Sequence, residues 1–174
     1  MATTEKVFAR KASGLVRGLS VVDAMGVGIM NIGLAPSMWF MISVGLLVMG
    51  FKKGDKIVTA SNNRPEWNFA DMGISMTGAV HVPVFTSLSI SDYQYIIAHC
   101  EAAMIFVADR KMFKAISPAI AMSGRDIPVY SFDDIEGIPG WKEIIEAGKA
   151  NAEKHRAAVE NIKSSVKPDD FASL

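Results

Sequence analysis

The stretch from Gly50 to Asp109 constrains the fold most, because short apolar runs alternate there with segments of helical periodicity. Apolar runs of roughly four to eight residues between turn residues are typical of buried strands, and longer periodic segments are typical of amphipathic helices. Repeated strand–helix units of this length predict a parallel sheet with right-handed crossovers. The sequence therefore predicts an α/β fold built as a doubly wound parallel sheet.

The predicted strands are short and follow one another along the chain at residues 56–60, 80–85, 104–108 and 128–132. Pro83 has no amide hydrogen to donate, so its strand is expected at an edge of the sheet or to end there. The run at 104–108 is apolar throughout, which is typical of a strand buried on both faces. Residues 170–174 resemble the start of one more strand, so the sheet is expected to be incomplete within this sequence.

Helices are predicted between the strands at residues 66–77, 92–99, 110–120 and 140–148, and a more charged helix continues to about residue 165. Pro65 suits the first turn of a helix, and Gly78 suits the end of one. Polar residues that can cap helix N-termini precede the first three helices: Asn63 or Arg64, Ser89 or Ser91, and Asp109.

Residues 24–51 form a run of 28 positions without a charged side chain, longer than the roughly 20 residues that span a bilayer. Basic residues flank it on both sides: Arg10, Lys11 and Arg17 before it, and Lys52 and Lys53 after it. Residues 1–42 are therefore predicted as a hydrophobic helical segment and a candidate membrane helix. The alternative is a buried helical hairpin bent at residues 33–36. Residues 43–50 could end the membrane segment or could be the last turns of a helix before the first strand.

The charge balance and the single cysteine exclude some classes of protein. The sequence has 18 basic and 18 acidic residues, and no basic stripe indicates a nucleic-acid partner. Cys100 is the only cysteine, so an internal disulfide is excluded and a reducing compartment is favoured. We therefore expect a cytoplasmic protein, with membrane association if residues 24–51 insert.

Four segments in a fixed order carry a family resemblance: GLLVMGFKKGDKI (45–57), NNRPEW (62–67), GAVHVPVF (78–85) and YIIAHCEAAMIFVAD (95–109). With these segments, residues 43–174 resemble the first part of the large N-terminal domain of the adenylate-forming (AMP-binding) enzymes, specifically the long-chain acyl-CoA synthetase branch. The final KPDDFASL resembles the approach to the phosphate loop of that family, a Ser/Thr/Gly-rich segment that ends in Lys-Gly.

The resemblance implies an ATP-dependent fatty acid–CoA ligase. Such enzymes use ATP and magnesium to form an acyl-adenylate from a fatty acid and then transfer the acyl group to coenzyme A. The sequence contains no phosphate loop and none of the later motifs, so it is expected to be a fragment that is inactive alone and binds none of these cofactors. The apolar run GVGIMNIG (26–33) follows no predicted strand and is not expected to bind a nucleotide.

A second resemblance covers the first 41 residues. RKASGLVRGLSVVDAMGVGIMNIGL (10–34) is similar to the start of an amino-acid/polyamine permease, where a cytoplasmic amphipathic stretch leads into the first membrane helix. The resemblance implies that Gly26, Gly28 and Gly33 match the point where that helix unwinds around its substrate. The alternative function is therefore a membrane-anchored or permease-derived fragment without enzymatic activity.

No catalytic, cofactor-binding or metal-binding residue is predicted. Cys100 follows His99 directly, but neighbouring residues of a helix do not face each other, so Cys100 is interpreted as a core thiol. His81 is interpreted as a histidine of the core or of a strand edge, and His155 as part of a solvated helix face.

The acidic pairs and the NNRPEW segment receive structural interpretations. Asp133 with Asp134, and Asp169 with Asp170, are expected to cap turns, because no further ligands follow at the spacing of a calcium loop. Arg64 and Glu66 are expected to stabilise the turn and the start of the helix after it.

Overall fold

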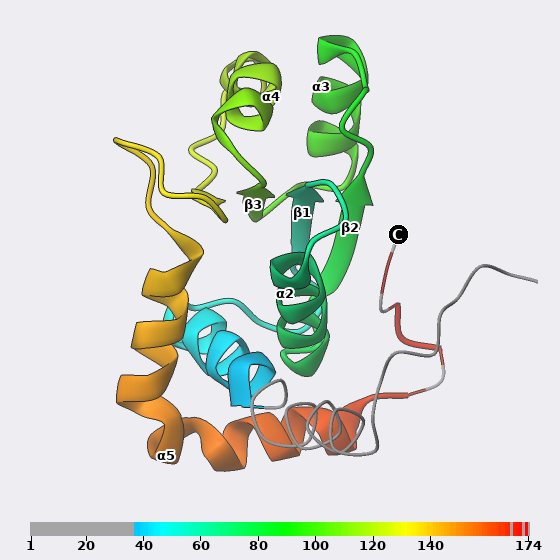
Figure 1. Cartoon of the computed structure of the whole chain (residues 1–174). Helices are drawn as coiled ribbons and strands as arrows, with labels where there is room; N and C mark the ends of the chain where they lie inside the picture. Colours follow the sequence, from blue (N-terminus) through cyan, green and yellow to red (C-terminus); the bar gives the residue numbers. More distant parts are fainter. Residues whose placement is uncertain (1–36, 168, 172, 174) are drawn as a thin grey trace, which may run out of the picture.

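The computed structural model describes residues 37–167, 169–171 and 173, and its centre is a parallel sheet. The sheet has four strands in the order β2-β1-β3-β4: β1 (Lys56–Ala60), β2 (Val80–Val84), β3 (Met104–Val107) and β4 (Val129–Ser131). The chain places β2 on one side of β1 and then returns to place β3 on the other side (Figure 1). This reversal is the doubly wound arrangement, so the predicted fold class is confirmed.

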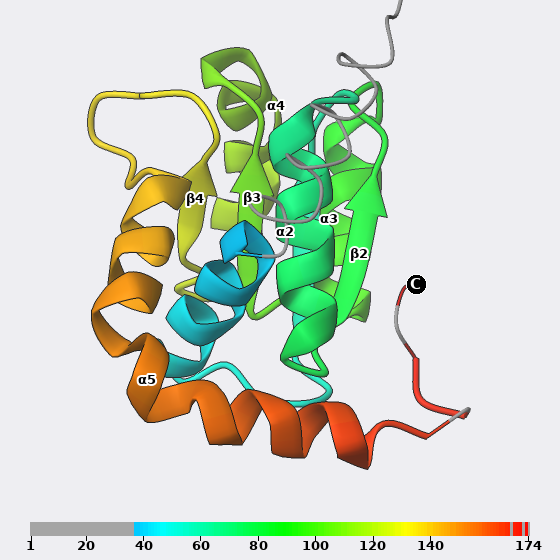
Figure 2. The same ribbon diagram turned by 60° about the horizontal axis from the view of Figure 1, so that its bottom comes forward.

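Helices cover both faces of the sheet. They are α2 (Pro65–Met76), α3 (Ile90–His99), α4 (Arg110–Met122) and α5 (Trp141–Ser165), and residues 37–48 form one more. α3 and α4 lie on one face, while α2, the helix of residues 37–48 and α5 lie on the other (Figures 1 and 2). Each face has its own hydrophobic core, and β1 contributes side chains to both. Val58 packs in the core of the α3–α4 face, and Ile57 packs in the core of the opposite face. This alternation is what a strand covered on both sides requires.

The predicted elements differ from the observed ones mainly at their ends. Each of the last three predicted strands is one or two residues too long, and the third helix continues to Met122. Asp109 caps α4 as predicted, since its side chain accepts a hydrogen bond of 2.7 Å from the Met112 amide. Ser89 rather than Ser91 caps α3. The two helical segments expected near the C-terminus are one element, α5, which is sharply bent (Figure 2).

The helix of residues 37–48 is part of the core. Ile42 and Leu46 are buried in the same cluster as residues of α2 and α5. At Gly45, a Cβ atom would overlap the backbone carbonyl of Ile144, and at Gly148 a Cβ would overlap that of Met41. The backbones of this helix and α5 therefore touch where they cross, and each supplies a glycine to the contact. The helix runs across the domain boundary expected between residues 42 and 43.

This packing bears on the membrane prediction for residues 24–51. Within the described part of the chain, no helix has both the length and the apolar character needed to cross a membrane. Ile42, Val44 and Leu46 are buried against protein, so membrane association of this half of the segment is not supported. Residues 24–36 lie outside the described residues, as do Gly26, Gly28 and Gly33 of the permease-like stretch. The hydrophobic helical segment predicted over residues 1–42 is therefore not confirmed.

At residues 170–174, where one more strand was expected, the described residues show a single isolated β-bridge. Ser173 forms a parallel bridge with His81 of β2, on the side of β2 that faces away from β1. This pairing places the last described residue beside the edge of the sheet.

Candidate functional site

The carboxyl ends of the four strands meet at one edge of the sheet, which we call the carboxyl edge. In open parallel sheets, ligands bind outside this edge, near the point where the strand order reverses. That point is at β1 here, because β1 lies between β2 and β3. The side chains that follow β1, β2 and β3 are therefore the first candidates for a binding site.

A cleft of about 460 Å³ opens at the carboxyl edge beyond β1 and β2, and we call it the candidate cleft. Its lining residues come from the two loops after these strands, from β2 and from α2: Ser61, Asn62, Asn63, Trp67, Pro83, Val84, Phe85 and Thr86. Thr86 Oγ1 donates a 3.2 Å hydrogen bond to Asn62 Oδ1 and joins the two loops. The Tyr93 hydroxyl donates to the carbonyl of Phe85, which fixes the backbone there. The Phe85 ring itself is 79% exposed.

The candidate cleft thus combines flat apolar groups with small polar ones. The rings of Trp67 and Phe85 can stack on a planar ligand, and the amides and hydroxyls of the loops can donate to it or accept from it. This is the usual composition of a small-molecule site, in which apolar walls hold the ligand and a few polar groups orient it.

Arg64 closes the carboxyl edge between β1, β3 and β4. Its guanidinium donates to Glu66 at 2.8 Å, to Asp133 at 2.9 Å and to the carbonyl of Ala108 at 3.1 Å. It also lies over the Phe132 ring, 5.5 Å from the ring centre. The hydrogen bond to Glu66 is the main cause that raises the pKa of Arg64, and the same bond lowers the pKa of Glu66. With these partners, Arg64 is a cross-link between strand ends and not a free anion receptor.

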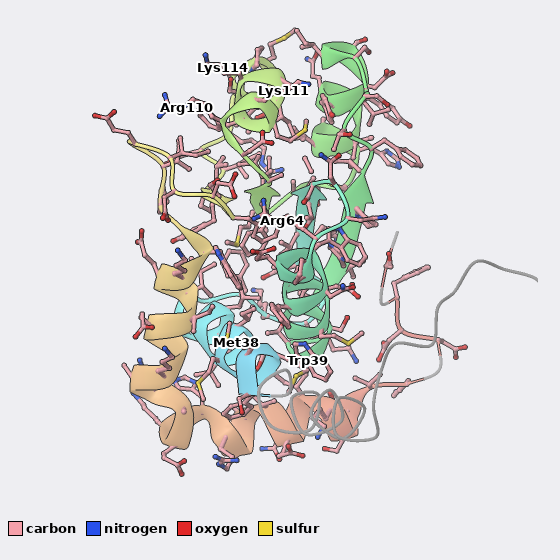
Figure 3. All side chains as sticks on the ribbon, viewed as in Figure 1. Met38, Trp39, Arg64, Arg110, Lys111 and Lys114 are labelled. Carbon is pink, nitrogen blue, oxygen red and sulfur yellow. The ribbon has the colours of Figure 1, made fainter. Side chains whose placement is uncertain are left out.

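Three basic residues lie on the first turns of α4, directly after the end of β3: Arg110, Lys111 and Lys114. We call them the basic cluster. Figure 3 shows them together at the end of α4 that begins at the carboxyl edge. All three are exposed, and none of them forms an ion pair with another described residue. Unpaired cations at this edge favour an anionic group, such as a phosphate, nearby.

His81 is a buried histidine on the edge strand, as the sequence predicted. Its Nδ1 lies 2.7 Å from Asp71 Oδ1, and its ring lies 5.2 Å from the Trp67 ring. Its Nε2 is buried and has no hydrogen-bond partner among the described residues. Burial is the main cause that lowers the pKa of His81, so the ring is neutral at pH 7. Its side chain does not belong to the lining of the candidate cleft.

Cys100 is a buried thiol, as predicted. Burial raises its pKa, so the thiol is a poor nucleophile. The neighbouring His99 ring stacks on Tyr95 with ring centres 5.3 Å apart, on the outside of α3. The structure therefore does not bring His99 to Cys100 as a catalytic base.

The acidic residues also have structural partners. Asp133 pairs with Arg64, Asp134 lies 3.5 Å from Lys142, and Asp170 pairs with Lys53. Across the part of the chain that the structure describes, no group of three or more metal-binding side chains gathers. His155 lies in the charged half of α5, but it is half-buried, so it is less exposed than the solvated face predicted for it.

The 2.8 Å contact between Arg64 and Glu66 at the start of α2 agrees with the role predicted for these two residues. Sequence reasoning missed the contacts of Arg64 with the other strand ends, and it missed the basic cluster. The partners of Arg64, Ala108 and Asp133, are more than 40 residues away along the chain, and only the folded sheet brings them together. The basic cluster had a local signal, since RKMFK (110–114) follows a buried strand and the capping residue Asp109 directly.

Comparison with known proteins decides the family. The family of AMP-binding enzymes matches residues 40–174. This chain belongs to that family. The match covers the whole sheet and all the labelled helices, so it includes the carboxyl edge described above.

Curated relatives agree with this assignment at low identity. This chain is 26% identical over 149 residues to a probable acyl-activating enzyme 16 of Arabidopsis thaliana, and the match covers 75% of this chain and 20% of the relative. It is 33% identical over 64 residues to a long-chain-fatty-acid–CoA ligase of Mycobacterium bovis, covering 37% of this chain and 11% of that ligase. The chain thus spans a fifth or less of the length of these relatives.

Solved structures share the fold. The luciferase-like enzyme of the mealworm Zophobas morio superposes with a TM-score of 0.61 at 17% identity, over 64% of this chain and 26% of that enzyme. A benzoate CoA ligase from Burkholderia xenovorans superposes with a TM-score of 0.58 at 18% identity, over 66% of this chain and 22% of that ligase.

Proposed function

We propose that residues 43–174 form the first part of the large domain of a long-chain fatty acid–CoA ligase, which uses ATP and magnesium to make an acyl-adenylate and then an acyl-CoA. The family match over residues 40–174 carries this proposal. The likeness to a long-chain-fatty-acid–CoA ligase supports the choice of substrate. The lone, buried Cys100 supports a cytoplasmic enzyme.

Within this reaction, the proposed role of the carboxyl edge is to hold a nucleotide-bearing substrate, either ATP or CoA; this differs from the expectation from the sequence, which was that the chain binds neither. The rings of Trp67 and Phe85 offer stacking surfaces for an adenine in the candidate cleft. The basic cluster at the start of α4 offers unpaired positive charge for phosphates. Neither surface supplies a nucleophile or a general base, so the proposed role is binding and orientation.

A binding measurement with the purified chain tests this role. Trp67 fluorescence should report binding of CoA or ATP, while adenosine, which lacks phosphates, should bind more weakly. Replacing Arg110, Lys111 and Lys114 by Ala should weaken binding roughly 5- to 150-fold, since each exposed ion pair contributes about 0.3–1 kcal/mol. Lys154→Ala, a charge change in the distant half of α5, is the matched control. If neither nucleotide binds, or if the triple variant binds as well as the parent, the proposed role is wrong.

A second measurement addresses catalysis. The 174 residues include no glycine-rich phosphate loop, so we expect this chain by itself to form no acyl-adenylate from ATP, magnesium and a long-chain fatty acid. Mass spectrometry of the reaction mixture, with pyrophosphate release as a second readout, checks this expectation. Acyl-adenylate formation by the purified chain would contradict it.

A further inference from the structure

The Arg64 side chain connects three segments that are far apart in the sequence. Arg64 precedes α2, and its Nε donates to Glu66 in the first turn of that helix. One terminal nitrogen donates to the carbonyl of Ala108 after β3, and the other donates to Asp133 after β4. Each partner thus accepts from a different nitrogen of the planar guanidinium. Lysine has a single ammonium and no such fork, so it cannot make the same three contacts in this geometry.

Through Ala108, this side chain reaches the origin of the basic cluster. The Ala108 carbonyl accepts a 3.1 Å hydrogen bond from Arg64 and another of 3.1 Å from the Asp133 amide. The Ala108 amide donates to the carbonyl of Ala60 at the end of β1. The next residue, Asp109, caps α4, and the basic cluster begins directly after it. Arg64 is therefore bonded to the strand end from which the cluster starts, and it lies between the cluster and α2 in the view of Figure 3.

The backbone of Arg64 lies between two residues that line the candidate cleft. Asn63 comes directly before it, and Trp67 follows in the first turn of α2. The Arg64 carbonyl accepts a 3.2 Å hydrogen bond from the Trp67 amide. One residue is thus tied to the cleft by its backbone and to Ala108 by its guanidinium, which fixes the start of α2 against the start of α4.

Each of the two surfaces also has a support that does not involve Arg64. The hydrogen bond between Thr86 and Asn62 joins the two loops of the cleft. The Asp109 side chain accepts from the Met112 amide and caps the helix that bears the basic cluster. Loss of the guanidinium should therefore leave both surfaces formed and change mainly their position relative to each other.

We propose that Arg64 is a positioning residue, whose guanidinium holds the candidate cleft and the basic cluster at the spacing that lets one nucleotide contact both. A ligand that engages two sites at once gains affinity over either contact alone, and it loses this gain when the sites are misplaced. Arg64 does not touch the ligand in this role, because each of its nitrogens already has a protein partner. The consequence for binding rests on the nucleotide-binding role proposed above.

Calorimetric titration of Arg64→Lys, which keeps the charge and loses the fork, tests this role. The nucleotide that the parent binds, ATP or CoA, should bind roughly 5- to 100-fold more weakly to the variant. Adenosine, which can contact only the cleft, and pyrophosphate, which can contact only the cluster, should each bind as they do to the parent. Arg125→Lys is the matched control, because Arg125 lies between α4 and β4, at the other end of the strands, and donates to the Glu101 carbonyl at 3.4 Å.

Hydrogen exchange gives a second readout, which needs no ligand. The Asp133 amide donates to the Ala108 carbonyl, so it should exchange roughly 3- to 30-fold faster in Arg64→Lys, as for the loss of charge-assisted contacts. The Ile105 amide, which donates to the Pro128 carbonyl near the start of β3, should be unaffected. Asp133→Asn removes the charge of one partner and keeps Arg64, so it should have the same effects in smaller measure and replaces Arg64→Lys if that variant does not fold.

Equal nucleotide binding by Arg64→Lys and Arg125→Lys would overturn the positioning role. An equal loss of nucleotide, adenosine and pyrophosphate would also overturn it, because that pattern indicates general loss of structure. An unchanged exchange rate at Asp133 would show that the guanidinium does not fix the strand ends. If the parent binds no nucleotide while exchange at Asp133 responds as expected, the proposed nucleotide-binding role is wrong and the tie between α2 and α4 stands.

Discussion

At the scale of single residues, His81 shows how burial sets the state of a titratable group. The imidazole is 1% exposed, and Asp71 at its Nδ1 is its one charged neighbour among the described residues. The loss of solvation disfavours the imidazolium more than Asp71 favours it, so the pKa of His81 is lowered from its ordinary value of 6.5. A neutral ring with Nδ1–H directed to the carboxylate follows from this balance.

The lowered pKa predicts acid sensitivity. As the pH falls below about 6.5, histidine in the unfolded chain takes up a proton before His81 does, so the free energy of unfolding should decrease. Each unit by which the pKa is lowered removes about 1.4 kcal/mol once the pH is below the lowered pKa. Urea unfolding between about pH 7.5 and 5.5 measures the slope, where ordinary carboxylates remain ionised. His81→Asn should flatten the slope and His155→Asn should leave it intact; an equal slope in both variants would exclude His81 as the cause.

At the scale of elements, the crossing of the helix of residues 37–48 with α5 explains two glycines inside helices. Glycine within a helix costs about 0.5–1 kcal/mol relative to alanine, so a helical glycine needs a reason. At Gly45 and Gly148, the reason is the direct contact of the two backbones. The contact also shows why an uncharged run in this sequence can be core: Ile42 and Leu46 pack against α2 and α5.

Alanine inside a helix is normally more stable than glycine, but the crossing predicts the opposite at this position. Gly148→Ala should destabilise the protein by about 1–3 kcal/mol or more, since the new Cβ forces two backbones apart. Gly140→Ala is the matched control at the start of the same helix, because its φ of −86° suits alanine and a Cβ there meets open space. Because alanine is a poorer N-cap than glycine, its cost should be about 0.5–1 kcal/mol, below that of Gly148→Ala. Chemical denaturation checks both, and a Gly148→Ala protein as stable as the parent would mean that these helices do not cross as described.

At the scale of the whole molecule, the sheet connects two cores that share no helix. One core lies under α3 and α4, and the other lies under α2, α5 and the helix of residues 37–48. β1 and β3 contribute alternate side chains to both, so loss of packing on one face should weaken the strands that the other face needs.

This coupling predicts one cooperative transition. Ile116 is fully buried on the α4 face, while Trp39, Trp67 and Trp141 belong to helices of the opposite face. Ile116→Ala should cost about 2–5 kcal/mol, and tryptophan fluorescence should report the whole of that loss. Met122→Ala, on the exposed side of the same helix, should cost less than about 0.5 kcal/mol. If the fluorescence midpoint does not move in Ile116→Ala while circular dichroism does, the two faces unfold separately.

The sequence by itself determined what depends on neighbours along the chain. The period of apolar residues predicted the strands and helices. Asp109 predicted one helix start, and Ser89 or Ser91 predicted another; Pro83 predicted a strand at the edge or the end of the sheet. The resemblance over residues 43–174 also identified the correct family. These properties are local or ordered along the chain, so a linear pattern contains them.

Only the tertiary structure decided which distant groups meet. The sheet brings Arg64 to Asp133, and the helix crossing converts an apolar run with a membrane-like composition into core. The turn after α5 brings Asp170 to Lys53 and Ser173 to His81. A segment that faces lipid and a segment that faces protein can have the same apolar composition. The distance along the sequence between two residues does not indicate whether they form an ion pair. Both depend on three-dimensional packing, which the period of a sequence does not encode.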